Sequence, residues 1–128
     1  LFTHDPVLGH ITTFGGHPVS CAAGKAALNV LLSESYIDTI AAKEKIIKKH
    51  FSNSVAYQCR TAGLWASLIF KDHETNKRIV HACIHQGIIT DWFLFAPEGL
   101  RISPPLCITE DELEAVCRKL LAIIDEYI

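Results

Sequence analysis

The order of periodic segments in this chain of 128 residues predicts an α+β fold, with helices packed on one face of a small, largely antiparallel sheet. Segments whose apolar residues recur every three or four positions stand near both ends of the chain. Short apolar runs bounded by glycine or proline lie between them and are typical of strands. Hydrophobic residues make up 49% of the chain, which is enough to build a core.

The first two predicted helices cover Pro18 to about Ser33 and Tyr36 to Phe51. Proline is favoured in the first turn of a helix, and small residues on nearly every side of the first helix indicate close packing against neighbours. The second helix has an apolar stripe formed by Ile37, Ile40, Ala41, Ile47 and Phe51. Its lysines fall mostly outside this stripe, which predicts a solvated face carrying Lys43, Lys45, Lys48 and Lys49.

The middle of the chain predicts several strands and one short helix. Val55, Tyr57 and Cys59 alternate with smaller or polar residues, and Leu64 to Phe70 is a more continuous apolar run. Residues Asn76 to Gln86 have helical spacing, with Gly87 as the stop. The remaining strands are predicted at Ile88–Thr90, Phe93–Phe95 and Leu100–Ser103.

The last helix has the clearest signal. Thr109 can cap it, and Glu112, three residues later, completes a capping box. The apolar residues that follow have helical spacing: Leu113, Val116, Cys117, Leu120, Leu121 and Ile124.

Charge and cysteine content exclude several classes. The net charge of −2 gives no electrostatic footprint for nucleic acid or an anionic membrane, and no apolar run is long enough to span a bilayer. The five cysteines contain no CxxC pair, which indicates neither a zinc site nor a disulfide framework and favours a reducing cytoplasm. His81 and His85 have ligand spacing on a helix, but nothing nearby suggests a third ligand, so we expect no metal.

A candidate anion site precedes the first helix. Two hydroxyl side chains, Thr12 and Thr13, stand just before Gly15 and Gly16, and Pro18 begins the helix. Glycines allow the backbone to approach a ligand, and the N–H groups of a helix N-terminus attract anions. The stretch therefore suggests a phosphate site, although the same residues could form an ordinary loop-to-helix junction.

Arg101 is the best single candidate for ligand binding. It lies in an apolar run just before a double proline, and the planar guanidinium can bind a carboxylate through two parallel hydrogen bonds. The alternative is an arginine on an edge strand that points into solvent.

Together these stretches resemble a known family. The stretch from Thr13 to Pro18, the tripeptide Gly63-Leu64-Trp65, and the stretch from Gly99 through Arg101 and Pro104-Pro105 to Leu113 have the order and separation seen in the C-terminal part of class III pyridoxal-phosphate aminotransferases. That group includes the acetylornithine, ornithine and 4-aminobutyrate aminotransferases. The resemblance implies the small C-terminal domain of a fold-type I pyridoxal-phosphate enzyme.

The resemblance also implies a domain organisation. Residues 1–17 would be the tail of an absent large domain and would carry the cofactor-phosphate loop, residues 18–34 the connecting helix, and residues 35–128 the small α+β domain. The chain contains no methionine, even at position 1, so we expect it to be part of a longer polypeptide.

Site roles follow from the same resemblance. Arg101 would bind the α-carboxylate of the amino acid or of the 2-oxo acid. Thr13 would reach across a homodimer interface to the phosphate of the partner subunit's pyridoxal 5'-phosphate, with Thr12 a weaker candidate, and Gly15 and Gly16 would shape the loop. His17 departs from the family pattern, which usually has Asn there.

The implied reaction is transfer of an amino group from an amino acid to a 2-oxo acid. The Schiff-base lysine of the family lies upstream of the glycine loop, and no lysine here matches it, so the chain alone is expected to be inactive. Two alternatives stay open: an aminomutase or decarboxylase on the same scaffold, and a free-standing, non-catalytic α+β binding module.

Overall fold

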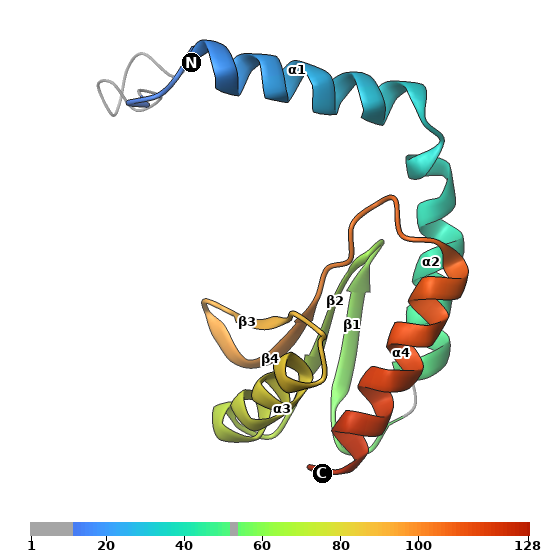
Figure 1. The fold of residues 1–128 in the computed structure, drawn as a ribbon. Helices are drawn as coiled ribbons and strands as arrows, with labels where there is room; N and C mark the ends of the chain where they lie inside the picture. The colour runs from blue at the N-terminus through green and yellow to red at the C-terminus, as the bar shows by residue number, and fades with distance from the viewer. Residues whose placement is uncertain (1–11, 52–53) are drawn as a thin grey trace. The chain divides into compact units, whose positions relative to one another are not determined.

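The computed structural model describes residues 12–51 and 54–128, which fall into two units that meet between Ser35 and Tyr36 (Figure 1). Each unit is considered by itself. The predicted tail of a larger domain lies outside the described residues as far as position 11. The helices and strands account for most of the described chain, and their types agree with the α+β prediction.

Helix α1 (Pro18–Ser33) is the main element of the first unit, and its bounds match the prediction. Pro18 occupies the first turn, where its missing N–H removes no helical hydrogen bond. Every residue of α1 is exposed or partly exposed, including Val19 and Leu32. The apolar surface of α1 is therefore available to surroundings beyond its own unit.

The second unit is a four-stranded antiparallel sheet covered on one face by helices. The strands β1 (Gln58–Ala62), β2 (Trp65–Ile69), β3 (Asp91–Phe93) and β4 (Ala96–Ile102) are arranged in the order β1-β2-β4-β3. Each neighbouring pair is antiparallel, which confirms the predicted sheet.

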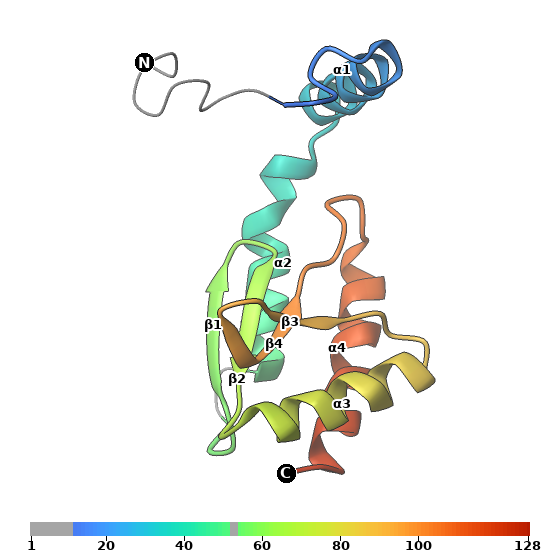
Figure 2. The same ribbon diagram turned by 90° about the vertical axis from the view of Figure 1, so that its left-hand side faces the viewer.

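Three helices form the second layer: α2 (Tyr36–Phe51), α3 (His73–His85) and α4 (Glu110–Asp125). Helices α2 and α4 lie side by side, and α3 runs across their direction (Figures 1 and 2). The helices and the sheet bury a single core, whose members are Ile47, Phe51, Tyr57, Leu64, Ala66, Leu68, Phe70, Ile79, Val80, Cys83, Leu100, Leu113, Cys117, Leu120, Ile123 and Ile124.

Four of the five predicted strand regions contain a strand, with different bounds. Residues Ile88–Thr90 are not a strand, because the Thr90 hydroxyl, rather than a backbone ladder, contacts β4 by donating to the Arg101 carbonyl. The strand predicted at Phe93–Phe95 ends at Phe93, since Leu94 and Phe95 form the turn into β4. Strand β4 begins at Ala96, four residues before the predicted start.

Two helix predictions also need correction. Helix α3 begins at His73 rather than Asn76, because the Asp72 side chain caps it by accepting from the Thr75 N–H at 2.7 Å. Lys43 does not belong to a solvated face: only 4% of it is exposed, and its ammonium donates to the Leu106 carbonyl at 2.8 Å. A long side chain can bury its stem and still satisfy its charged end through one carbonyl.

Helix α4 begins as predicted. Thr109 accepts from the Glu112 N–H, and the Glu112 carboxylate accepts from the Thr109 N–H at 2.9 Å, which completes the capping box. The Thr109 N–H, followed by the Thr109 hydroxyl, donates to the Glu112 carboxylate and holds its pKa below the usual value.

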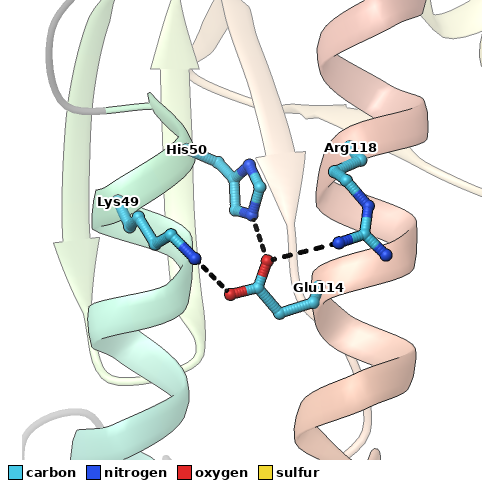
Figure 3. A network of polar contacts seen from close by, with 4 residues as sticks. All are labelled: Lys49, His50, Glu114 and Arg118. Atoms are coloured by element: carbon cyan, nitrogen blue, oxygen red, sulfur yellow. Dashed lines mark hydrogen bonds and ion pairs between the residues drawn. The ribbon is translucent and has the colours of Figure 1, made fainter.

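One carboxylate joins α4 to α2 (Figure 3). Glu114 accepts from the Lys49 ammonium at 2.8 Å, lies 2.6 Å from the His50 ring nitrogen Nε2, and is 3.9 Å from the Arg118 guanidinium. The Lys49 hydrogen bond, followed by that of His50, lowers the pKa of Glu114 to about 2. The two helices thus share a polar contact in addition to their apolar one.

This contact predicts how stability depends on pH. Because the folded pKa of Glu114 lies below its unfolded value, its stabilisation is present above about pH 4.5 and is lost as the pH falls toward 2. We expect Glu114→Gln to lower the free energy of unfolding at pH 7 and to flatten its decline below pH 4.5. Urea unfolding followed by tryptophan fluorescence at pH 7, 4 and 3 measures both effects. Glu126→Gln, at the exposed end of α4, is the control, and equal pH slopes in both variants would contradict the assignment.

Candidate functional site

The face of the sheet away from the helices carries a row of polar side chains. In the strand register Arg60 pairs with Ser67, Ser67 with Arg101, and Arg101 with Asp91. Residues directly opposite each other in antiparallel strands point to the same face. Leu100, the neighbour of Arg101, is fully buried beneath the helices, so Arg101 and its row occupy the open face.

Arg101 and Asp91 form an ion pair within this row. The guanidinium Nη2 lies 3.6 Å from the Asp91 Oδ2, with 40% of the Arg101 side chain and 50% of the Asp91 side chain exposed. The other carboxylate oxygen, Oδ1, accepts from the Trp92 N–H at 2.8 Å and so fixes the carboxylate. The remaining guanidinium donors of Arg101 have no hydrogen-bond acceptor among residues 12–51 and 54–128, and they can serve an external anion.

Two aromatic side chains and a glycine shape the surface beside the row. Phe93 and Trp65 border a hollow that also includes Arg60 and Ser67. Gly99 leaves room for two of the lining side chains, because a Cβ there would lie 2.7 Å from the Ser67 hydroxyl and 3.4 Å from the Phe93 ring. The open face therefore offers an apolar hollow whose lining includes Arg60 but not Arg101, and this combination of apolar lining and few polar groups is typical of small-molecule sites.

The segment that follows Arg101 is anchored to the helical layer. The ammonium of the buried Lys43 on α2 donates to the carbonyl of Leu106, and the Ile108 N–H donates to the carbonyl of Pro105 at 3.1 Å. Pro104 and Pro105 restrict the backbone between β4 and this anchor. The end of β4, with Arg101, is thus fixed at both sides.

The predicted phosphate loop forms two consecutive turns before α1. The Gly15 N–H donates to the Thr12 carbonyl at 3.3 Å, and the His17 N–H donates to the Phe14 carbonyl at 3.1 Å. Gly16 has φ +79°, a conformation that other residues rarely adopt. At Gly15 a Cβ would lie 2.7 Å from the Thr12 methyl group, so a larger residue there would displace the exposed Thr12 side chain. The loop brings Thr12, Thr13, Gly15 and Gly16 together at the helix start.

The helix start itself retains capacity for an acceptor. His17 occupies the N-cap position, and within the described part of the chain its side chain makes no capping hydrogen bond. The first turn of α1 also contains no acidic residue. Backbone N–H groups at such a position, together with the positive end of the helix dipole, are suited to an anion.

Several residues of the open face were missed by reasoning from the sequence. Arg60, Ser67 and Asp91 join Arg101 only through the strand register, which brings two distant hairpins together. The alternation of buried and exposed residues in β2 could have shown that Ser67 points away from the core. No local pattern indicates which residue of β3 pairs with Arg101 of β4.

Comparison with known proteins identifies the family of this chain. Residues 3–124 match the family model described as aminotransferase class-III. Among solved structures, the adenosylmethionine-8-amino-7-oxononanoate aminotransferase of Methanocaldococcus jannaschii is 25% identical with a TM-score of 0.75, and the match covers 99% of this chain and 32% of that chain. The ornithine δ-aminotransferase of Plasmodium falciparum is 25% identical with a TM-score of 0.71, covering 92% and 31%. An aminotransferase of Bacillus anthracis has 22% identity, a TM-score of 0.77 and coverage of 94% and 31%.

The chain spans about a third of the length of the solved structures that it resembles. In residues 12–51 and 54–128, no helix is both long and apolar enough to cross a membrane.

The Gly99 contact predicts a coupled pair of substitutions. Gly99→Ala should lower the free energy of unfolding by about 1–3 kcal/mol, because the new methyl group overlaps the Ser67 hydroxyl. Ser67→Gly removes the closest overlapping atom, so the double variant should be more stable than the sum of the single effects. A double-mutant cycle in urea measures this coupling. Gly24→Ala, in open space on α1, should not destabilise, and additive costs for Gly99 and Ser67 would refute the contact.

Proposed function

Because the chain belongs to the class-III aminotransferase family, we propose that it is the C-terminal part of a longer enzyme that transfers an amino group from an amino acid to a 2-oxo acid. In this proposal residues 1–17 belong to the large domain, residues 18–34 are the connecting helix, and residues 35–128 are the small domain. The coverage of about a third of each similar structure supports this assignment.

The cofactor in this proposal is pyridoxal 5'-phosphate, and the loop before α1 has the chemistry to hold its phosphate. Thr12 and Thr13 offer exposed hydroxyls, Gly16 lets the backbone turn sharply, and the start of α1 offers N–H groups. Bound pyridoxal phosphate supplies an electron sink that permits the exchange of the amino group. The lysine that binds this cofactor covalently lies outside the chain in this proposal, so the chain alone lacks activity.

Arg101 carries the proposal, since it is an arginine with free donors on the open face of the sheet. Its guanidinium would bind the carboxylate of the amino acid or the 2-oxo acid through two parallel N–H···O bonds. That contact would orient the substrate, and correct orientation of the reacting groups supplies a large part of the rate. The strand position of Arg101 suits this role, because β4 is paired on both sides.

Thr13 has a different role in the proposal: its hydroxyl donates to the phosphate of the cofactor held by the partner subunit of a homodimer. The exposed loop and the exposed apolar side chains of α1 are consistent with surroundings supplied by other parts of the enzyme or by the partner.

The first test is Arg101→Lys in the longer enzyme. Lysine keeps the charge but loses the second parallel donor, so kcat/KM for carboxylate substrates should fall. The expected fall corresponds to a loss of about 2–4 kcal/mol of transition-state stabilisation. Steady-state kinetics measures this loss. Arg78→Lys is the matched control, because Arg78 lies over the Tyr127 ring on the helical side of the sheet. Unchanged kinetics in Arg101→Lys would remove Arg101 from substrate binding.

The second test is Thr13→Val. Loss of one hydrogen bond to a charged group costs about 1.5–3 kcal/mol, so the affinity for pyridoxal phosphate should fall roughly tenfold to a hundredfold. Equilibrium titration of the apoenzyme with the cofactor gives this value.

A heterodimer tests whether Thr13 acts across the interface. One subunit carries Thr13→Val and the other lacks the cofactor-binding lysine. If Thr13 acts on the partner's cofactor, the site with the lysine receives a normal Thr13 and keeps near-normal affinity. Affinity as weak as in the Thr13→Val homodimer would show that Thr13 acts within its own subunit or not at all.

A further inference from the structure

We propose that Asp91 is a specificity-determining residue that limits how strongly Arg101 binds a carboxylate. This inference rests on the proposed role of Arg101 as the substrate-binding arginine. Asp91 is an internal counter-ion on the neighbouring strand, and an incoming carboxylate must share the guanidinium with it. Asp91 therefore lowers the advantage that Arg101 gives to a carboxylate ligand over an uncharged ligand of the same shape.

The position of Asp91 makes it a fixed counter-ion. Asp91 lies directly opposite Arg101 in the β3–β4 register, so both side chains leave the same face of the sheet. Its Oδ1 is held by the Trp92 N–H at 2.8 Å, which leaves Oδ2 toward the guanidinium at 3.6 Å. Since 3.6 Å is longer than a normal N–H···O hydrogen bond, the pair is electrostatic and leaves the donors of Arg101 free.

A bound carboxylate would meet both charges of this pair. A ligand that accepts from the free donors of Arg101 would place its negative charge near Asp91, and like charges at such separations repel. Ser67, on the other side of Arg101, is uncharged, so the repulsion on this row comes from one side only. The next arginine on the row, Arg60, donates to the neutral Gln58 amide at 3.2 Å and brings no negative charge.

The effect should be moderate and specific to anions. Both side chains are about half exposed, and exposed ion pairs are weak and screened by salt. We expect removal of the Asp91 charge to tighten carboxylate binding by about twofold to fivefold at low salt, and by less at high salt. An uncharged ligand should bind equally well with or without that charge.

The experiment uses the full-length enzyme loaded with its cofactor and two unreactive probes, sodium propionate and propionamide. Isothermal titration gives the dissociation constant of each probe for the wild type, Asp91→Asn, Asp91→Glu and Arg101→Lys. Asparagine keeps an acceptor for the Trp92 N–H and removes only the charge. We expect Asp91→Asn to bind propionate more tightly, Asp91→Glu to resemble the wild type, and propionamide to be unaffected. Asp111→Asn, on the exposed start of α4, controls for a general change in net charge.

The outcomes separate this inference from the proposed function. If Arg101→Lys does not weaken propionate binding, the role of Arg101 itself fails. If Arg101→Lys weakens binding while Asp91→Asn leaves it unchanged or weakens it too, Asp91 is not a competing counter-ion and this inference is overturned. Steady-state kinetics adds a second readout: Asp91→Asn should lower KM for a 2-oxo acid with little change in kcat. Melting temperatures of the variants report any structural effect.

Discussion

The register between β2 and β4 is the constraint on which the rest of the second unit depends. Leu68 pairs with Leu100, and both are fully buried against the helices. Because side chains alternate along a strand, this buried pair places Ser67 and Arg101 on the open face. A slip of one residue would bury Arg101 and expose the leucines, so the burial of one apolar pair also fixes the candidate ligand-binding arginine.

The helical layer contributes to the site from the buried side of the sheet. It buries the core, and it also holds the segment after Arg101 through the hydrogen bond from Lys43 to Leu106. The shared carboxylate of Glu114 joins α4 to α2, the helix that carries Lys43 (Figure 3). A binding side chain on a paired strand with its exit segment anchored is held more rigidly than one on a loop, and rigidity favours oriented binding.

The two candidate sites differ in how they are built. The loop before α1 is local, since its turns join residues three apart and Gly16 supplies the positive φ that the second turn requires. The row on the open face is assembled from two hairpins, β1–β2 and β3–β4, that are separated in sequence by α3. A substitution in the loop should therefore change the backbone structure of the loop alone, whereas one in the core beneath β4 can move every side chain of the row.

The sequence by itself determined the helices, the presence of an antiparallel sheet, and Arg101 and the glycine loop as candidates. These features depend on local signals, such as the capping box at Thr109 and the apolar spacing of α4. Only the tertiary structure decided that Lys43 is buried, that β3 ends at Phe93, and that Asp91 faces Arg101. Periodicity shows which side chains share a face of one element. Pairing between strands depends on how all the elements bury the core together, so it cannot be predicted from any one segment.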